Sequence, residues 1–235
     1  MFLEVKNLNV GYGDVQVLWD VSFKVDKGMI VSLVGANGAG KTTLLKTISG
    51  LIRPMSGEIL FDGKPLTHLS SKEIVGLGIV HVPEGRRLFP DMSVEENLLM
   101  GAFRRKKDPK IKEDLEKVYE IFPRLKERRK QKAGSMSGGE QQMCAMARGL
   151  MGSPKLLLVD EMSLGLAPLI VDDLIDIVKA IHKQGTTVFI VEQDVHLALS
   201  NSDYGYVLAT GRIMMEGPSR DLLNNKQIKE VFLGL

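Results

Sequence analysis

Residues 29–43 read Met-Ile-Val-Ser-Leu-Val-Gly-Ala-Asn-Gly-Ala-Gly-Lys-Thr-Thr, and they set the class of fold. Met29–Val34 is an apolar run, which is typical of a buried strand in a parallel sheet. Gly35–Thr42 matches the phosphate-loop pattern G-x-x-x-x-G-K-S/T in full, and Lys41–Leu51 is expected to be a helix. Because a phosphate loop joins a strand to a helix, this order of segments predicts a nucleotide site.

The loop offers several groups that bind phosphate. Its glycines allow backbone N–H groups to turn inward around phosphate oxygens, and the N-terminus of the following helix adds a favourable partial charge. Lys41 is expected to reach the β- and γ-phosphates, and the Thr42 hydroxyl is expected to bind Mg²⁺. The candidate phosphate-binding residues are Gly35, Asn37, Gly38, Ala39, Gly40, Lys41, Thr42 and Thr43.

A second apolar strand, Leu156–Val159, ends in two carboxylates, Asp160 and Glu161. Asp160 is expected to hold Mg²⁺, through water, at the phosphate end of the sheet. Glu161 would then lie beside the γ-phosphate and polarise the attacking water as a general base. Taken alone, this strand is better interpreted as one that ends in two solvated carboxylates. A phosphate loop in the same chain favours a role for both carboxylates in the nucleotide site.

A third motif, Ser137-Gly138-Gly139-Glu140, precedes the strand that ends in the carboxylates. Ser137 is expected to cap the helix that follows, and the two glycines let backbone amides approach an anion. This turn predicts a second phosphate-binding surface, which would engage the nucleotide held by another copy or by a related chain. The alternative is an ordinary capped start of a helix.

Strands that alternate with helices predict an α/β fold with a mainly parallel sheet. Phe2–Val10 and Val15–Val25 are expected to form an antiparallel sheet at the N-terminus. Three helices, over Val94–Arg105, Ile111–Phe122 and Arg124–Lys132, are expected to form an inserted helical subdomain. The other expected elements are strands at Gly57–Phe61, Ile79–Val82, Val188–Val191 and Tyr206–Leu208, and helices at Gln141–Met151, Ile170–Gln184 and His196–Ser200.

The composition of the chain is that of a folded protein and argues against several other classes. Of 235 residues, 44% are hydrophobic and 26% are charged, as in a folded chain with a substantial core. The net charge of +2 argues against a protein that wraps nucleic acid by bulk charge. The single cysteine, Cys144, excludes an internal disulfide and indicates a reducing compartment. No apolar stretch is long enough to cross a membrane and the N-terminus lacks the pattern of a signal peptide, so a cytoplasmic protein is expected.

The three motifs, in this order, resemble the ATP-binding cassette (ABC) family. The resemblance implies a P-loop NTPase core that uses ATP and Mg²⁺, and a single nucleotide-binding domain over residues 1–235. Its ATP-binding core would comprise residues 1–84 and 155–220, its helical subdomain about 85–154, and its helical tail 221–235. Tyr12 is similar to the aromatic residue that stacks on adenine. In this family the Ser-Gly-Gly turn of one subunit closes over the ATP of another, in a head-to-tail dimer that hydrolysis releases.

Further segments resemble one branch of the family, the ATPases of branched-chain amino acid importers. This resemblance implies a subunit on the cytoplasmic face of the cell membrane. Its partners would be a second ATP-binding subunit, transmembrane permease subunits and, indirectly, a periplasmic or extracellular substrate-binding protein, with no nucleic acid. The segments that carry it are Val82–Pro90, Ser93–Leu98, Gly134–Gln142, Ser163–Pro168 and Val191–Asp194.

Three positions depart from the wider family pattern. Glu84 replaces the usual glutamine, and its carboxylate is a candidate to contact Mg²⁺ or its water. Gln193 replaces the usual switch histidine, so it can donate a hydrogen bond to phosphate but cannot titrate. Ala167 lies where many cassettes have an aspartate. We therefore expect a partner ATPase that supplies the missing histidine and aspartate. The expected catalytic residues are Glu161, Lys41 and Gln193, and the expected metal ligands are Thr42, Asp160 and Glu84.

Other interpretations stay open at this point. The chain could be a soluble cassette of nucleic-acid repair or translation, although it lacks the long coiled coil and the second cassette of those classes. It could serve a transporter of another substrate, or it could be a non-hydrolysing regulatory subunit, against which Glu161 argues. The histidines show no metal-ligand spacing, so surface or packing roles are expected for His68, His81, His182 and His196.

Overall fold

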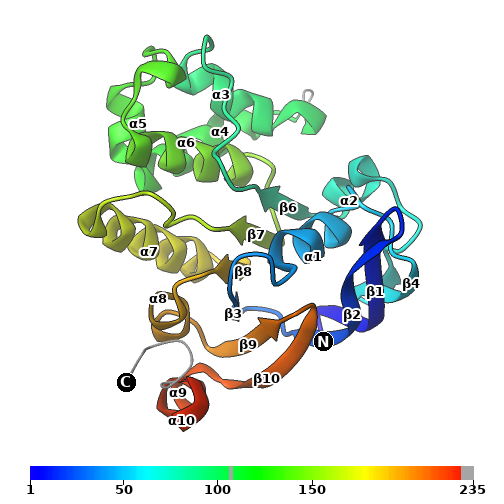
Figure 1. Ribbon diagram of the computed structural model, residues 1–235. Helices are drawn as coiled ribbons and strands as arrows, with labels where there is room; N and C mark the ends of the chain where they lie inside the picture. Colours follow the sequence, from blue (N-terminus) through cyan, green and yellow to red (C-terminus); the bar gives the residue numbers. More distant parts are fainter. Residues whose placement is uncertain (106–107, 229–235) are drawn as a thin grey trace. The chain divides into compact units, whose positions relative to one another are not determined.

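The structure is a computed structural model that describes residues 1–105 and 108–228 (Figure 1). The chain divides into two compact units, one formed by Met1–Ile74 and Thr187–Leu235 and the other by Val75–Thr186. We refer to them as unit 1 and unit 2. Among the described residues, no helix has both the length and the apolar character needed to span a membrane. The expected division into a core, a helical subdomain and a tail stays a prediction.

An antiparallel sheet forms the first part of unit 1. Its strand order is β2-β1-β4-β5, where β1 is Leu3–Tyr12 and β2 is Val15–Val25. The two long strands pair from Leu3↔Val25 to Tyr12↔Val15, and Gly13 turns the chain between them with a φ of 56°. The antiparallel N-terminal sheet is therefore confirmed. The shorter strands are β4 (Ser56–Phe61) and β5 (Lys64–Pro65).

The core strands of unit 1 are mainly parallel, as the sequence predicts. The central strand β3 (Ile30–Val34) is buried along its whole length, and it pairs in parallel with β8 (Thr187–Glu192) on one side and β9 (Tyr204–Ala209) on the other. β10 (Arg212–Pro218) pairs antiparallel with β9. No apolar run marks β10 in the sequence, because its residues alternate between exposed and partly exposed positions and only Gly217 is buried.

The helices of unit 1 follow the ends of its strands. The first, α1 (Lys41–Ile48), is shorter than expected because Gly50 takes a left-handed conformation, with a φ of 71°. α8 (Val195–Ser200) packs with Val34 and Val207 of the core strands. The tail is helical over α9 (Ser219–Asn224) and α10 (Lys226–Ile228), and residues 229–235 of the expected tail lie outside the described residues. α2 (Ser71–Leu77), for which the sequence motifs predict no element, follows the antiparallel sheet along the chain and contains Ile74, where the first segment of unit 1 ends.

Unit 2 combines two parallel strands with most of the helices. The strands β6 (Ile79–Val82) and β7 (Leu156–Asp160) pair in parallel. Between them along the chain comes an insertion of helices, as predicted. The helices of unit 2 are α3 (Val94–Gly101), η1 (Phe103–Arg105), α4 (Ile111–Ile121), α5 (Pro123–Glu127), η2 (Ala133–Ser135), α6 (Gly138–Leu150) and α7 (Pro168–Lys183).

One predicted helix is wrong over half of its length. The segment Arg124–Lys132 is helical only as far as Glu127. Beyond that point the carbonyl groups of Arg129 and Gln131 accept hydrogen bonds from the backbone amides of α3 (3.0 and 2.9 Å). Because the first amides of a helix need acceptors from outside the helix, this tertiary pairing competes with a continued helix.

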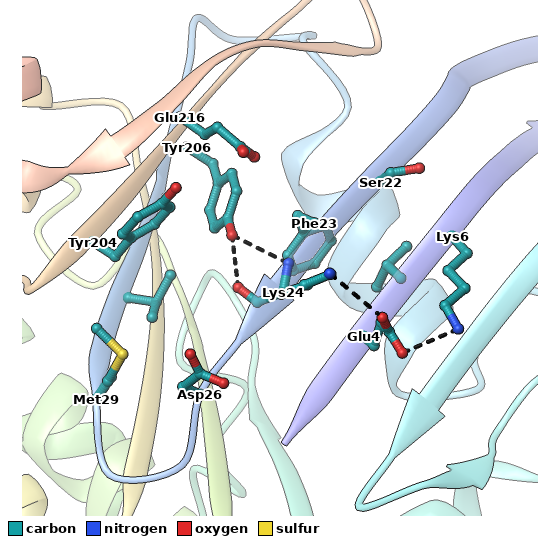
Figure 2. Close-up of a pocket in the computed structure, with 12 residues that line it drawn as sticks. Glu4, Lys6, Ser22, Phe23, Lys24, Asp26, Met29, Tyr204, Tyr206 and Glu216 are labelled. Atoms are coloured by element: carbon teal, nitrogen blue, oxygen red, sulfur yellow. Dashed lines mark hydrogen bonds and ion pairs between the residues drawn. The ribbon is translucent and has the colours of Figure 1, made fainter. Parts of the chain in front are cut away.

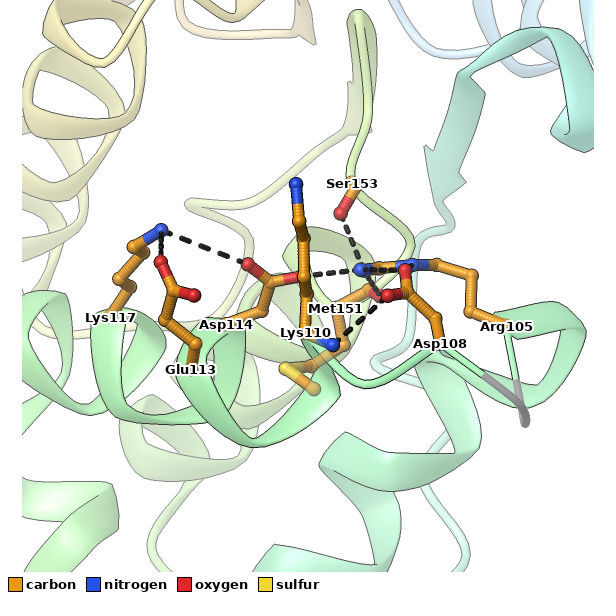
Figure 3. A network of polar contacts seen from close by, with 8 residues as sticks. All are labelled: Arg105, Asp108, Lys110, Glu113, Asp114, Lys117, Met151 and Ser153. Carbon is orange, nitrogen blue, oxygen red and sulfur yellow. Dashed lines mark hydrogen bonds and ion pairs between the residues drawn. The ribbon is translucent and has the colours of Figure 1, made fainter.

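A polar network centred on Arg105 joins three segments of unit 2 (Figure 3). The guanidinium donates to the carboxylates of Asp108 and Asp114, and it also donates to the carbonyl of Met151 (3.1 Å) and to the Ser153 hydroxyl. Burial alone lowers the pKa of Arg105, but the hydrogen bonds and charges of the two aspartates outweigh it and raise the pKa above its ordinary value. Arg105 therefore fixes the 3₁₀ turn η1 to the start of α4 and to the loop that follows α6.

Candidate functional site

The phosphate loop has the backbone conformation that its glycines allow. Gly38 and Gly40 have φ values of 79° and 107°, in the region that favours glycine. A Cβ atom at Gly40 would also lie only 2.5 Å from Cδ2 of Leu18. Both the backbone conformation and the lack of space therefore favour glycine at this position. The amide of Ala39 donates to the carbonyl of Ala36 (3.1 Å), which closes the loop before α1 begins.

Lys41 is placed as a phosphate-binding lysine requires. It is the first residue of α1, it is buried, and its Nζ donates to the carbonyls of Gly35 (2.9 Å) and Ala36 (3.1 Å). The ammonium group is thus folded back over the loop that its own helix follows. An ammonium beside inward-facing amides and a helix N-terminus forms a surface for an anion.

Tyr12 lies beside this loop, at the end of β1. Its hydroxyl is 3.3 Å from the hydroxyl of Thr43, in the first turn of α1. Tyr12 is 49% exposed, so a ligand has access to it. An open aromatic ring anchored to the helix of the phosphate loop is suited to stack on a base.

Gln193 meets the same edge of the sheet by strand pairing. Val34 at the end of β3 is paired with Glu192 at the end of β8, and the two strands are parallel. Gly35 and Gln193 therefore leave neighbouring strands side by side, and Gln193 is exposed. Unit 1 thus brings together Tyr12, the phosphate loop and Gln193.

The two carboxylates after β7 differ in their surroundings. Asp160 is the last residue of the strand and is fully buried, whereas Glu161 is partly exposed. Glu161 has a φ of 45°, which is unfavourable for a residue with a side chain. Residues held in such conformations concentrate at functional sites, because surrounding structure must maintain them.

Glu84 is placed beside these carboxylates by the pairing of β6 with β7. Val82 is paired with Val159, so Glu84 and Glu161 both lie two residues beyond a paired position. Because the strands are parallel, both residues emerge at the same edge. In unit 2, Glu84, Asp160 and Glu161 thus all lie at the carboxyl end of the β6–β7 pair.

The donor set of unit 2 fits Mg²⁺ held in part by a nucleotide. A buried carboxylate such as Asp160 is stabilised by a nearby cation. Mg²⁺ is commonly held by one or two carboxylates together with substrate phosphates and water. Within residues 1–105 and 108–228, no three His, Cys, Asp or Glu side chains gather into a group that could hold a metal ion by themselves.

The Ser-Gly-Gly turn starts α6 with a capping box, so the predicted cap at Ser137 is confirmed. The Glu140 carboxylate accepts hydrogen bonds from the amide (3.0 Å) and the hydroxyl (2.8 Å) of Ser137, and it lies 3.0 Å from Nε of Arg128. Burial alone raises the pKa of Glu140, but the bonds from Ser137 and the nearby arginine charges hold the pKa below its ordinary value. A Cβ atom at Gly139 would lie 2.5 Å from Cγ2 of Ile170, so this glycine permits close packing of α7.

Two arginines, to which the sequence motifs assign no role, connect this turn to the Glu84 segment. Arg148 of α6 donates to the carbonyls of Arg87 (2.7 Å) and Arg86 (3.1 Å). Arg86 in turn donates to Gln141 (3.2 Å), in the first turn of α6. Arg86 and Arg87 both have positive φ values, 64° and 48°, which Arg148 helps to maintain. The only signal in the sequence was a basic residue among the apolar residues of α6.

A cavity of about 530 Å³ in unit 1 lies away from this edge (Figure 2). Its lining includes Met29 and Val31, at the amino end of β3, whereas the phosphate loop follows the carboxyl end of that strand. In Figure 2 the Tyr206 hydroxyl bridges to the backbone of Lys24, where it donates to the carbonyl (2.7 Å) and accepts from the amide (3.1 Å). This cavity therefore contains none of the candidate nucleotide residues.

Comparison with known proteins identifies the family. Residues 18–163 match the family model described as ABC transporter. The chain is 49% identical, over 99% of both chains, to the high-affinity branched-chain amino acid transport ATP-binding protein BraG of Pseudomonas aeruginosa. It is 36% identical, again over 99% of both, to the probable branched-chain amino acid transport ATP-binding protein LivF of Archaeoglobus fulgidus.

A solved structure agrees with these relatives. The ADP conformation of an ATP-binding cassette of an ABC transporter superposes with a TM-score of 0.88 at 28% identity, over 100% of this chain and 99% of that one. The expected P-loop fold and the resemblance to the branched-chain importer branch are both confirmed. The chain therefore belongs to the ABC transporter family, as one of its ATP-binding cassettes.

Proposed function

We propose that the chain is the ATP-hydrolysing subunit of a membrane transporter that imports branched-chain amino acids. The observation that carries the enzymatic part is the phosphate loop, in which the Lys41 ammonium donates to the carbonyls of Gly35 and Ala36 at the start of the loop. The 49% identity to BraG, a branched-chain amino acid transport protein, supports the choice of cargo.

In this proposal each residue of the site has one task. The loop amides and Lys41 bind the phosphates, and Tyr12 stacks on the adenine. Mg²⁺, held through Thr42 and Asp160 with Glu84 nearby, would neutralise the phosphate charge that develops during transfer to water. Glu161 takes a proton from the attacking water, while Gln193 donates a hydrogen bond to a phosphate oxygen. Glu161 is suited to this task because its carboxylate directly follows the strand that ends at Asp160 and is partly exposed.

A second cassette completes the site in this proposal. The Ser137–Glu140 turn presents the N-terminus of α6 and two glycines, a combination that favours the phosphate oxygens of a nucleotide on another chain. Ala167 is the N-cap residue of α7, and its methyl side chain offers no carboxylate to the partner. A different ATPase subunit would supply an aspartate and a histidine where this chain has Ala167 and Gln193.

Docking to transmembrane permease subunits is supported by an apolar groove of about 380 Å³ in unit 2. Among its lining residues, Phe89 and Phe103 are exposed, and Arg148 lies 5.9 Å from the Phe89 ring. Exposed large apolar side chains around a groove are typical of a protein interface. The same Arg148 holds the segment after Glu84, so the groove is in direct contact with residues that follow a nucleotide-site candidate. The chain would thereby lie on the cytoplasmic face of the membrane, with a substrate-binding protein on the other side.

The test uses cells whose own copy of the gene is deleted. Wild-type protein should restore leucine uptake, and the Glu161→Gln variant, expressed at the same level, should not. If the wild-type protein restored uptake of an unrelated solute but not of leucine, the proposed ATPase activity would stand and the proposed cargo would be wrong. Leucine uptake that is equal with Glu161→Gln would contradict the assigned role of ATP hydrolysis.

A further inference from the structure

His81 lies next to the carboxylate that is proposed to hold Mg²⁺. Its Nε2 is 4.0 Å from Oδ2 of Asp160, and the two side chains are only 8% and 0% exposed. The sequence predicts no more than a surface or packing role for this histidine. Its burial beside a carboxylate that we propose as a metal ligand suggests a more specific role.

Strand pairing explains how the two side chains meet. His81 in β6 is paired with Leu158 in β7, and the strands are parallel. Paired residues share a face of the sheet, and every second residue of a strand returns to the same face, so Asp160 lies on the face of His81. His81 is the one polar residue of β6, which reads Ile-Val-His-Val. An imidazole in place of an aliphatic side chain is thus directed at a buried carboxylate.

The electrostatics of burial give this contact a consequence. A carboxylate removed from water is stabilised by nearby dipoles and N–H groups, and their effect is stronger in a low dielectric. At 4.0 Å, Nε2 of His81 is beyond hydrogen-bond distance of Oδ2, so its influence on the orientation of Asp160 is electrostatic. Glu84 follows His81 by three residues. One short segment therefore carries both the histidine beside Asp160 and the second candidate carboxylate, Glu84.

We propose that His81 is a positioning residue, which orients the Asp160 carboxylate for Mg²⁺ bound with the nucleotide. The inference rests on the proposed function, because it takes Asp160 as a metal ligand. Removing the imidazole should weaken the part of nucleotide binding that depends on Mg²⁺. Nucleotide binding without Mg²⁺ should stay unchanged, because the proposal gives His81 no role toward the phosphates or the base.

The experiment measures the Kd of the non-hydrolysable nucleotide AMP-PNP by calorimetry, once with excess Mg²⁺ and once with EDTA. The ratio of the two values isolates the contribution of the metal. The variants are His81→Leu, which keeps the volume but loses the N–H group, and His81→Gln, which retains an N–H donor of similar reach. Asp160→Asn is the reference for loss of the ligand. If His81→Leu does not fold, His81→Asn replaces it, since its shorter amide does not reach as far.

We expect His81→Leu to reduce the ratio of the Kd in EDTA to the Kd in Mg²⁺ about fivefold, while its Kd in EDTA stays unchanged. The same ratio for His81→Gln should stay within about twofold of wild type. A His81→Leu variant that lowers Tm but keeps the wild-type ratio would overturn the positioning role, because it would show packing alone. If Asp160→Asn also keeps the wild-type ratio, then Asp160 is not a ligand and the proposed site fails together with the inference. Loss in Asp160→Asn without loss in His81→Leu overturns only the inference.

Discussion

The hydroxyl groups of Tyr12 and Thr43 lie 3.3 Å apart, which connects the end of β1 to the first turn of α1. The contact anchors a half-exposed ring next to the phosphate loop. The ring and the hydroxyl make separable contributions, because phenylalanine keeps the first and removes the second.

Tyr12→Ala should weaken ATP binding about fivefold to tenfold, since stacking of an aromatic ring contributes about 1 kcal/mol. Tyr12→Phe should stay within about threefold of wild type, because a long, partly buried hydrogen bond between two hydroxyls contributes about 0.5 kcal/mol. Calorimetric titration with AMP-PNP measures both values. Equal affinity of Tyr12→Ala and wild type would remove the ring from the adenine site.

Glu161 should show opposite effects on stability and activity. Glu161→Gly relieves the positive φ of 45° and should raise the free energy of unfolding by up to about 1 kcal/mol, while turnover is lost. Glu161→Gln keeps the shape and should reduce ATP turnover about 100-fold or more without weakening nucleotide binding. Urea unfolding and a phosphate-release assay provide the two measurements. Substantial turnover in the glutamine variant would exclude Glu161 as the base.

The capping box of α6 predicts a pH dependence of stability. The pKa of Glu140 is held below its ordinary value of 4.5, so the carboxylate stabilises the fold fully above pH 4.5 and loses this contribution as the pH falls through the lowered pKa. The difference in Tm between wild type and Glu140→Gln should therefore be constant near neutral pH and shrink under acid conditions. Ser137→Ala should cost about 1 kcal/mol through loss of the cap. A difference in Tm that grows toward low pH would contradict the assignment.

Arg148 should matter for both the fold and the site. Arg148→Met removes two hydrogen bonds from a charged donor and should lower the free energy of unfolding by about 2 kcal/mol. It should also reduce ATP turnover, because the segment that follows Glu84 loses its support. Lys130→Met is the matched control, since Lys130 is an exposed basic residue. Similar effects of the two substitutions would show that charge, and not the carbonyl contacts, is responsible.

The Arg105 network offers a test of coupling within unit 2. Arg105→Met and Asp114→Asn should each destabilise the protein by about 2 kcal/mol, since each removes a charge-assisted hydrogen bond between partly buried side chains. The double variant should recover about 1 kcal/mol of the summed loss in a double-mutant cycle. Chemical denaturation of the four proteins gives the coupling energy. Simple additivity would mean that the aspartate and the arginine act independently.

Local patterns accounted for much of the candidate site. The phosphate loop, the strand that ends at Asp160 and the cap at Ser137 each depend on neighbouring residues, so spacing alone could predict them. The bounds of α5 could not be predicted in this way. Its last residues are drawn into hydrogen bonds with the start of α3, and such pairing between distant segments leaves no local signal.

The sequence by itself determined the class of fold, the presence of a phosphate loop and the order of the three motifs, because steric preference and hydrophobic periodicity act over a few residues. Tertiary structure alone decided which distant residues meet. Pairing of Val34 with Glu192 brings Gln193 to the phosphate loop, and pairing of His81 with Leu158 directs an imidazole at Asp160. The physical reason is that strand register is set by the packing of the whole sheet. Which residues of two strands meet depends on this register, so the local sequence of either strand does not predict the contact.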